Sequence, residues 1–108
     1  DSARRAVDCA LGIVRAAADE SARQPDRPIR VGLGIHAGEP IADRDDYVGL
    51  AVNVAARLAQ SARAGEILVS DVVRALAGGA RLPEMTLREG LVLKGVNDPP
   101  RVYCLKAE

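Results

Sequence analysis

Two polar side chains lie one helical turn apart in an otherwise apolar stretch of this 108-residue chain. In the segment DDYVGLAVNVAARL, residues 45–58, they are Asn53 and Arg57. Residues spaced by four project side by side from a helix, so both groups can act on one ligand. The amide offers an acceptor and two donors, and the guanidinium is a planar fork that suits phosphate oxygens. The pair therefore favours phosphate chemistry, although a solvated helix edge explains the same spacing, because surface arginine is common.

The elements that would position this pair indicate an α/β domain. Apolar residues recur at steps of three and four over residues 2–21 and 49–62, which predicts two helices. Ser70 is expected to cap a third helix. The expected order is a helix at 2–21, strands at 29–36 and 39–42, a helix at 49–62, a strand at 67–70, a helix at 71–77, and strands at 87–94 and 102–105. This order is typical of a mixed sheet with helices packed on it.

The first strand and the second helix are each expected to have one distinctive face. Gly32 and Gly34 alternate with apolar residues in the strand, which predicts that something packs close to the glycine face. On the helix, one narrow stripe holds the polar side chains of Asn53, Arg57, Gln60 and Ser61. The other positions of this helix, Val52 and Ala56 included, are expected to be buried. The charged run at 43–46 is expected to be a loop.

The composition argues against several classes of function. The formal net charge is +0, so the chain has no overall electrostatic attraction for nucleic acid or an anionic membrane. Two Tyr and no Trp or Phe also argue against a base-stacking surface. No apolar run approaches about 18 residues, so no membrane contact is expected from this segment. Cys9 and Cys104 form no metal-binding pattern and are expected to be buried, reduced thiols, which fits a cytoplasmic protein, with or without a membrane anchor elsewhere.

The chain resembles the C-terminal half of the class III nucleotidyl cyclase catalytic domain, the adenylate/guanylate cyclase family. The matching motifs are RVGLGIHAGEP at 30–40, DDYVGLAVNVAARLAQSARAGEILVS at 45–70, and LREGLVLKGVNDPPRVYCL at 87–105. They occur in the family's order, and the Asn-x-x-x-Arg element is the specific part. The resemblance implies an α+β, ferredoxin-like cyclase fold that is incomplete, with a mixed, mostly antiparallel sheet. It makes residues 1–108 the C-terminal portion of a single catalytic domain.

The resemblance also implies a reaction: conversion of ATP to 3′,5′-cyclic AMP and pyrophosphate in intracellular signalling. It implies that Asn53 orients the ribose and that Arg57 stabilises the negative charge on the α-phosphate. It assigns the purine to Asp46, seven residues before Asn53, and an aspartate at this place goes with adenine rather than guanine. Asp45 is the neighbouring candidate, but the spacing selects Asp46. A charged turn is the alternative interpretation of both aspartates.

Other positions receive weaker assignments from the same resemblance. Lys94 is a candidate for a phosphate contact near the last hairpin, with Val96 as the alternative occupant of that position. His36 receives a structural role. The family uses two Mg or Mn ions held by two aspartates of an N-terminal segment. Neither aspartate motif occurs in this chain, so the ligands of these ions are expected to lie outside it.

Family active sites form between two domains packed head to tail, so a second cyclase domain, in a homodimer, is the expected partner. Loss of the N-terminal segment would leave unpaired sheet edges, so the isolated chain is expected to be inactive and to oligomerise. Two alternatives stay open: a non-catalytic cyclase-like module for nucleotide binding or dimerisation, and a plain α/β interaction domain. The joint presence of Asp46, Asn53 and Arg57 favours the enzyme, because a binding module does not need the arginine.

Overall fold

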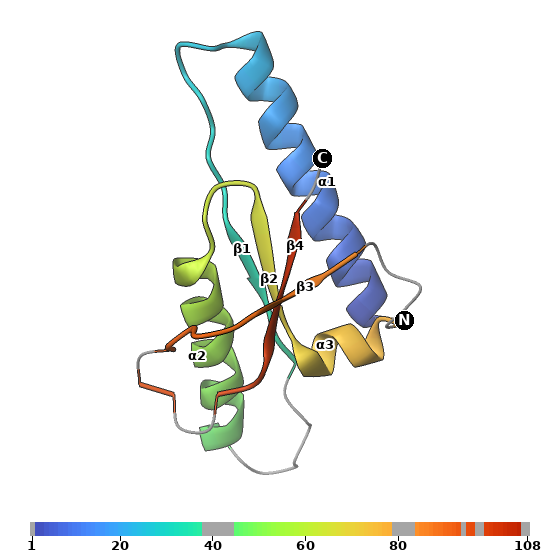
Figure 1. The fold of residues 1–108 in the computed structure, drawn as a ribbon, viewed down its shortest axis with the longest axis vertical. Helices are drawn as coiled ribbons and strands as arrows, with labels where there is room; N and C mark the ends of the chain where they lie inside the picture. The colour runs from blue at the N-terminus through green and yellow to red at the C-terminus, as the bar shows by residue number, and fades with distance from the viewer. Residues whose placement is uncertain (1, 38–44, 79–83, 94, 97–98, 107–108) are drawn as a thin grey trace.

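The fold is a four-stranded sheet with three helices, seen here in a computed structural model (Figure 1). The structure describes residues 2–37, 45–78, 84–93, 95–96 and 99–106, and for residues 45–50 it describes the backbone alone. The elements in chain order are α1 (Ser2–Arg23), β1 (Leu33–Ile35), α2 (Asp45–Ser61), β2 (Glu66–Ser70), α3 (Asp71–Leu76), β3 (Thr86–Arg88) and β4 (Val102–Lys106). The α/β class predicted from the sequence is confirmed.

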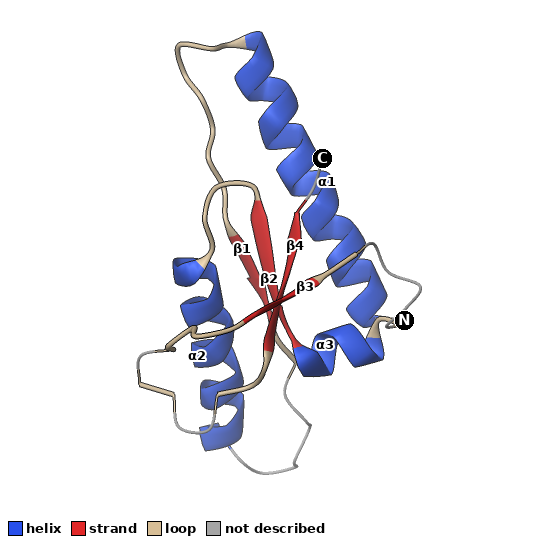
Figure 2. Ribbon diagram, in the orientation of Figure 1, coloured by secondary structure: helices blue, strands red, loops and turns tan. Residues whose placement is uncertain are grey.

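The sheet is mixed and mostly antiparallel, as predicted. Its strand order is β1-β2-β4-β3. β1 runs parallel to β2, with Leu33 opposite Ile67, and β4 runs antiparallel to both β2 and β3. Helices α1 and α3 lie on one side of the sheet and α2 lies on the other (Figure 2). Among the described strands, β1 and β3 form the two edges.

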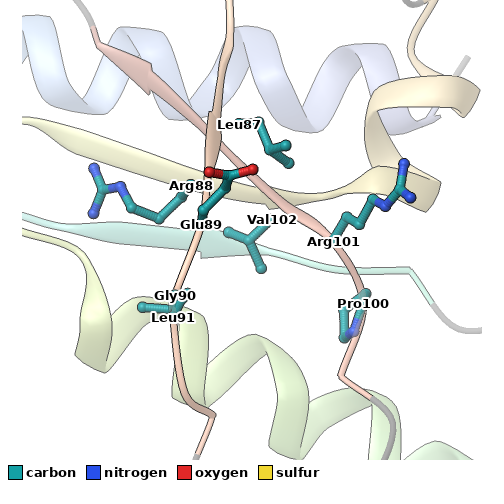
Figure 3. A pocket seen from close by; sticks show the side chains of 8 residues that line it. All are labelled: Leu87, Arg88, Glu89, Gly90, Leu91, Pro100, Arg101 and Val102. Atoms are coloured by element: carbon teal, nitrogen blue, oxygen red, sulfur yellow. The ribbon is translucent and has the colours of Figure 1, made fainter.

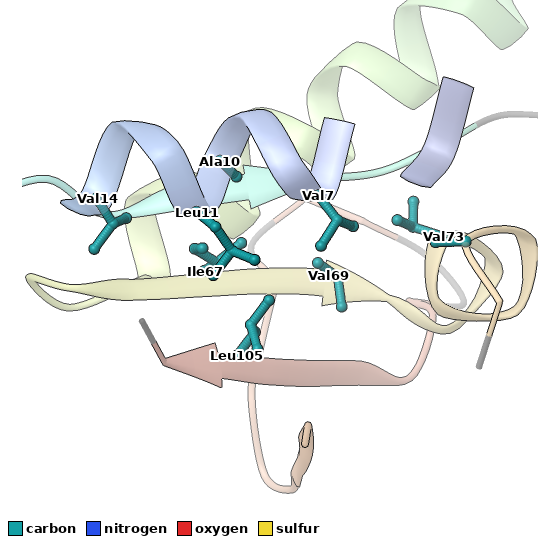
Figure 4. Close-up of a cluster of buried hydrophobic side chains, with 9 residues drawn as sticks. Val7, Ala10, Leu11, Val14, Ile67, Val69, Val73 and Leu105 are labelled. Atoms are coloured by element: carbon teal, nitrogen blue, oxygen red, sulfur yellow. The ribbon is translucent and has the colours of Figure 1, made fainter. Parts of the chain in front are cut away.

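The face under α1 and α3 is covered by apolar side chains. Val7 and Leu11 of α1 point toward Ile67 and Val69 of β2 (Figure 4). The helix can cover the strand because its buried residues recur at three- and four-residue steps: Val7, Ala10, Leu11, Val14 and Ala17. Such burial contributes about 25 cal/mol per Å² of apolar surface, so this face supplies a large part of the folding free energy.

The face under α2 is closed by a close approach of helix and strand. A Cβ atom added at Gly34 would lie 2.4 Å from the backbone nitrogen of Ala59 and 2.8 Å from the carbonyl oxygen of Ala55. At Gly32 it would lie 2.8 Å from the carbonyl oxygen of Ala62. Both glycines therefore allow β1 to contact the backbone of α2, and the predicted close packing on the glycine face is confirmed.

Two predicted helix ends are also informative. Ser70 caps α3 as expected, because its hydroxyl accepts a hydrogen bond from the amide of Val73. Helix α2, in contrast, begins at Asp45 rather than at residue 49. The prediction that the whole charged run 43–46 is a loop was therefore wrong, because Asp45 and Asp46 form the first turn of the helix. Acidic residues are generally favourable in the first turn of a helix, because their negative charge interacts with the positive end of the helix dipole.

The predicted strands are shorter in the structure. The strand expected at 87–94 covers only Thr86–Arg88, because Gly90 adopts a φ of 73° and turns the chain. The strand expected at 29–36 is limited to Leu33–Ile35. The strand expected at 39–42 lies outside the described residues.

Three burial predictions were wrong. Val52 is 63% exposed and Ala56 is also exposed, so the uncovered side of α2 is broader than its polar stripe. Cys9 is exposed, because it lies beside the buried stripe of α1 rather than on it. Cys104 is buried as predicted. In the part of the chain that the structure describes, no helix combines the length and apolar character needed to cross a membrane.

Candidate functional site

Asn53 and Arg57 lie on the side of α2 that faces away from the sheet. Asn53 is exposed and Arg57 is half-buried, whereas Val54 and Leu58 of the same helix are buried against the sheet. The Nη1 atom of Arg57 donates a hydrogen bond to Oε1 of Gln60 at 3.1 Å. The Nε atom of Arg57 is buried and has no hydrogen-bond partner among the described residues. The amide and the guanidinium are thus carried by one helix, with one donor of the guanidinium unsatisfied.

The position of α2 is fixed by β1 and by the turn that follows the helix. The glycines of β1 set the distance between the strand and the helix. After α2, Gly65 adopts a φ of 82° and its amide donates to the carbonyl of Val31 at 2.8 Å. This turn sends the chain directly into β2. Backbone contacts therefore hold the C-terminal half of α2, which includes Arg57 and begins just after Asn53.

The segment between β3 and β4 packs beside α2. Leu93 is buried in the same cluster as Val54 and Leu58, and Val96 packs against that cluster. The amide of Val96 donates to the carbonyl of Leu93 at 3.1 Å. Lys94 itself lies outside the described residues. The structure thus brings the neighbours of Lys94 to α2 and leaves the contact of the lysine as a prediction.

Asp46 lies on the same helix as Asn53, two turns earlier. A seven-residue step on a helix corresponds to about 10 Å along the axis and nearly the same side of the cylinder. The backbone therefore aligns Asp46, Asn53 and Arg57 along one helix. The side chain of Asp46 is not among those the structure describes, so its assignment to the purine stays a prediction.

His36 directly follows β1, and the pairing of Ile35 with Val69 places it next to Ser70, the last residue of β2, and Asp71, the first residue of α3. Burial lowers the pKa of His36, and the nearby carboxylate of Asp71 partly opposes this effect. Its Nδ1 atom is buried without a hydrogen-bond partner among the described residues. The structural role of His36 stays a prediction.

A buried ion pair crosses the sheet on the α2 side. The carboxylate of Glu66 in β2 contacts the guanidinium of Arg88 in β3 at 2.7 Å, and it also accepts from the backbone amide of Arg63 at 2.9 Å. The hydrogen bond from Arg88 lowers the pKa of Glu66. Burial, followed by the charge of Glu66, raises the pKa of the Cys104 thiol. The cysteine is therefore a protonated, unreactive core residue.

A hollow lies at the β3–β4 hairpin, and the described residues that line it include none of the predicted site residues. Its lining residues are Leu87, Arg88, Glu89, Gly90, Leu91, Pro100, Arg101 and Val102. The guanidinium groups of Arg88 and Arg101 point away from each other (Figure 3). Because Arg88 is already paired with Glu66, the hollow has no converging set of groups for an anion.

Comparison with known proteins gives the family of the chain. Residues 1–107 match the adenylate and guanylate cyclase catalytic domain. The chain belongs to this family. The resemblance inferred from its motifs is therefore confirmed, and the mixed sheet with its packed helices is part of a cyclase domain.

Two curated proteins illustrate the relationship of this cyclase chain to longer proteins. It is 40% identical over 67 residues to an adenylate cyclase of Mycosarcoma maydis, a match that covers 56% of the chain and 3% of that protein. It is 34% identical over 79 residues to putative adenylate cyclase 3 of Rhizobium meliloti (strain 1021), which covers 72% of the chain and 14% of that protein. The cyclase chain thus spans a small part of the curated relatives that it matches.

The described part of the cyclase chain holds no group of three or more His, Cys, Asp or Glu side chains that would suit a metal ion. Class III cyclases typically use two metal ions, and the residues described here do not form a ligand set for them. Any ions at Asn53 and Arg57 would therefore need carboxylates from outside the described residues, because Mg²⁺ prefers oxygen ligands.

Two features of the site were missed by sequence reasoning. Gln60 was placed on the polar stripe of α2, but its hydrogen bond to Arg57 was not predicted. The i,i+3 spacing was a usable signal, because residues three apart are neighbours on a helix. The pairing of Glu66 with Arg88 links residues 22 positions apart and has no local signal in the sequence.

Proposed function

We propose that this chain supplies the ribose- and phosphate-binding half of an adenylate cyclase active site. The supporting observation is that a member of the cyclase family carries an exposed Asn53 and a partly unsatisfied Arg57 on one firmly held helix. Homology to proteins named as adenylate cyclases also favours ATP as the substrate. The chain would form the C-terminal portion of one catalytic domain, over residues 1–108.

In the proposed reaction, the ribose 3′-oxygen attacks the α-phosphorus of ATP. The new O3′–P bond closes the ring, and the 3′-hydroxyl releases its proton to solvent. The bond from the α-phosphorus to the bridging oxygen breaks, and pyrophosphate leaves with that electron pair. Asn53 would orient the ribose so that its hydroxyl faces the phosphorus. Arg57 would stabilise the negative charge that accumulates on the α-phosphate, which is the main requirement of phosphoryl transfer.

Specificity and phosphate binding would use two further residues. Asp46 would accept a hydrogen bond from the exocyclic amine of adenine, a donor that guanine lacks at that position. Lys94 would contact the phosphates from the segment that packs beside α2. Mg or Mn ions would neutralise the triphosphate and assist the leaving pyrophosphate. The ligands of these ions would come from an N-terminal segment or from a second cyclase domain in a head-to-tail homodimer. The cyclic AMP would serve intracellular signalling in the cytoplasm.

The isolated chain is proposed to be inactive, because it offers no described ligand set for the metal ions. The same observation favours the alternative function, a non-catalytic cyclase-like module that binds nucleotide or another cyclase domain. The two functions differ in whether cyclic nucleotide is made at all.

The first experiment is therefore an assay of the whole protein with Mn-ATP and, in parallel, Mn-GTP. We expect cyclic AMP from ATP and little product from GTP. Replacement of Arg57 by Ala should lower kcat by about 100-fold to 1,000-fold, the effect typical of losing one preorganised transition-state donor. Arg63→Ala is the matched control, because this exposed arginine lies just beyond the same helix. If neither ATP nor GTP gives a cyclic product, the non-catalytic cyclase-like module is favoured.

A further inference from the structure

The guanidinium of Arg57 is hydrogen-bonded within α2. Its Nη1 atom bonds to Gln60, which lies three residues further along the helix. Asn53 lies four residues in the opposite direction. Side chains on a helix normally lean toward its N-terminus, so Arg57 would by default lie nearer to Asn53. The hydrogen bond to Gln60 therefore occupies one donor of the guanidinium with a neighbour on the side of Arg57 opposite to Asn53 along the helix.

The buried Nε atom indicates that this arrangement is not the one that binds phosphate. Nε carries a donor that is shielded from solvent and has no partner among the described residues. An unsatisfied buried donor is unfavourable, more so on a charged group. A phosphate would bind best through two parallel donors of the guanidinium fork. With Nη1 bonded to Gln60 and Nε shielded, the fork is only partly available.

We propose that Gln60 is a positioning residue that holds Arg57 in a resting position until the α-phosphate of ATP displaces it. This inference rests on the proposed function, because it takes Arg57 as the phosphate-binding residue. The exchange is favourable in the presence of nucleotide, since a charged phosphate oxygen is a stronger acceptor for a guanidinium than a neutral amide oxygen. Release from Gln60 would also free the shielded Nε to find a partner.

Replacement of Gln60 by Met in the whole protein tests the proposal. Methionine has a similar length and helix propensity, so the change removes the acceptor and little else. Arg57 would no longer have to leave Gln60, and kcat/KM for Mn-ATP should rise by about threefold, the effect of one modest hydrogen bond. An unchanged or lower kcat/KM would overturn the proposal, because it would mean that Gln60 is neutral or prepares Arg57 for catalysis.

A double-mutant cycle separates this effect from a general change in the helix. In an Arg57→Ala background, Gln60→Met should leave kcat/KM unchanged, because no guanidinium is left to hold. Gln24→Met is the control, since the Gln24 amide donates to Glu20 at 3.2 Å at an exposed position far from α2. A threefold rise in either of these two variants would refute the assignment.

A second measurement on the 108-residue chain needs no catalysis. The ¹⁵N relaxation of the Arg57 Nε–H group should report a restrained side chain in the wild type and a more mobile one in Gln60→Met. Equal mobility in both would show that Gln60 does not hold Arg57, even if the cyclase assignment is correct. Full activity of the Arg57→Ala variant, in contrast, would refute the proposed function itself.

Discussion

The two faces of the sheet are built in different ways. Under α1 and α3, side chains such as Leu11, Ile67 and Leu105 fill the space between helix and strand. Under α2, an apolar cluster also packs on the sheet and includes Val54, Leu58 and Leu68, but the glycines of β1 remove side chains so that this strand and the helix touch through their backbones. The α2 face also holds the buried pair of Glu66 and Arg88, whereas the residues of the α1 cluster are all apolar.

This difference separates general stability from the placement of the site. A face filled by apolar side chains tolerates exchanges that conserve volume, because neighbouring side chains can repack. A backbone contact cannot adjust in this way, and a displacement of about 1 Å can be costly for catalysis. The helix that carries Asn53 and Arg57 lies on the rigid face. The following predictions test this contrast, beginning with the largest effect.

Substitution of Gly34 by Val should cause the largest loss. The new Cβ atom would meet the backbone of Ala59 at 2.4 Å and of Ala55 at 2.8 Å, so α2 would have to move away from β1. We expect a loss of about 4 kcal/mol or more in the free energy of unfolding, measured with urea. Gly12→Ala is the control, because nothing lies within 4 Å of its added Cβ. It should stabilise α1 by about 0.5–1 kcal/mol. Equal stabilities of the two variants would contradict a rigid α2 face.

The buried ion pair should give the next largest effect. Glu66→Gln leaves the guanidinium of Arg88 without its carboxylate, and loss of a hydrogen bond between charged groups costs about 1.5–3 kcal/mol. Only 6% of the Glu66 side chain is exposed but 28% of the Arg88 side chain is, so solvent screens the pair in part. Urea unfolding of the variant and the wild type at neutral pH measures the difference.

The same variant makes a prediction about pH. The pKa of Glu66 is lowered in the folded protein, chiefly by the hydrogen bond from Arg88. A lowered pKa adds stability above the unfolded value of about 4.3, and this stability is lost as the pH falls through the folded pKa. The difference between wild type and Glu66→Gln should therefore shrink as the pH falls below about 4. A constant difference would show that the carboxylate charge does not stabilise the fold.

Much of the contrast between the two faces of the sheet could be predicted from local sequence patterns. Helix α1 and the cap at Ser70 follow from periodicity and residue type, and the alternating Gly32 and Gly34 predicted a close contact before any partner was known. The start of α2 was missed, because Asp45 suits both a loop and the first turn of a helix. Periodicity also predicted that Val52 is buried. The pattern of apolar residues does not show how much of the helix surface the sheet covers.

The candidate site shows a similar division between local and non-local information. The spacing of Asn53 and Arg57 is a property of one helix, so the sequence placed both on it. The hydrogen-bond partner of the Arg57 guanidinium depends on a choice between neighbours at i−4 and i+3, which spacing alone leaves open. The pair of Glu66 and Arg88 depends on strand order, with β4 between their strands. No pattern along the chain contains that order.

A conservative exchange on the α1 face should have a small effect. Leu11 is 6% exposed and packs in the cluster with Ile67 and Val69. Leu11→Met keeps the volume nearly constant, so it should cost less than about 1.5 kcal/mol in urea unfolding. Leu11→Ala, as the positive control, should cost about 2–5 kcal/mol, because it leaves a cavity. A Met variant as unstable as the Ala variant would mean that this face is as rigid as the α2 face.

The smallest effect is expected for the charged contact on the α1 and α3 side. The guanidinium of Arg74 in α3 lies 4.6 Å from the ring centroid of Tyr103 in β4. Arg74 is half-buried, and a cation–π contact at such a site contributes about 0.5–1 kcal/mol. Arg74→Met keeps the apolar stem over the ring and removes the charge, so thermal unfolding should shift by only a few degrees. A loss as large as that of Glu66→Gln would mean that charge is as important on this face as on the α2 face, and the contrast between the two faces would then lie in the glycines alone.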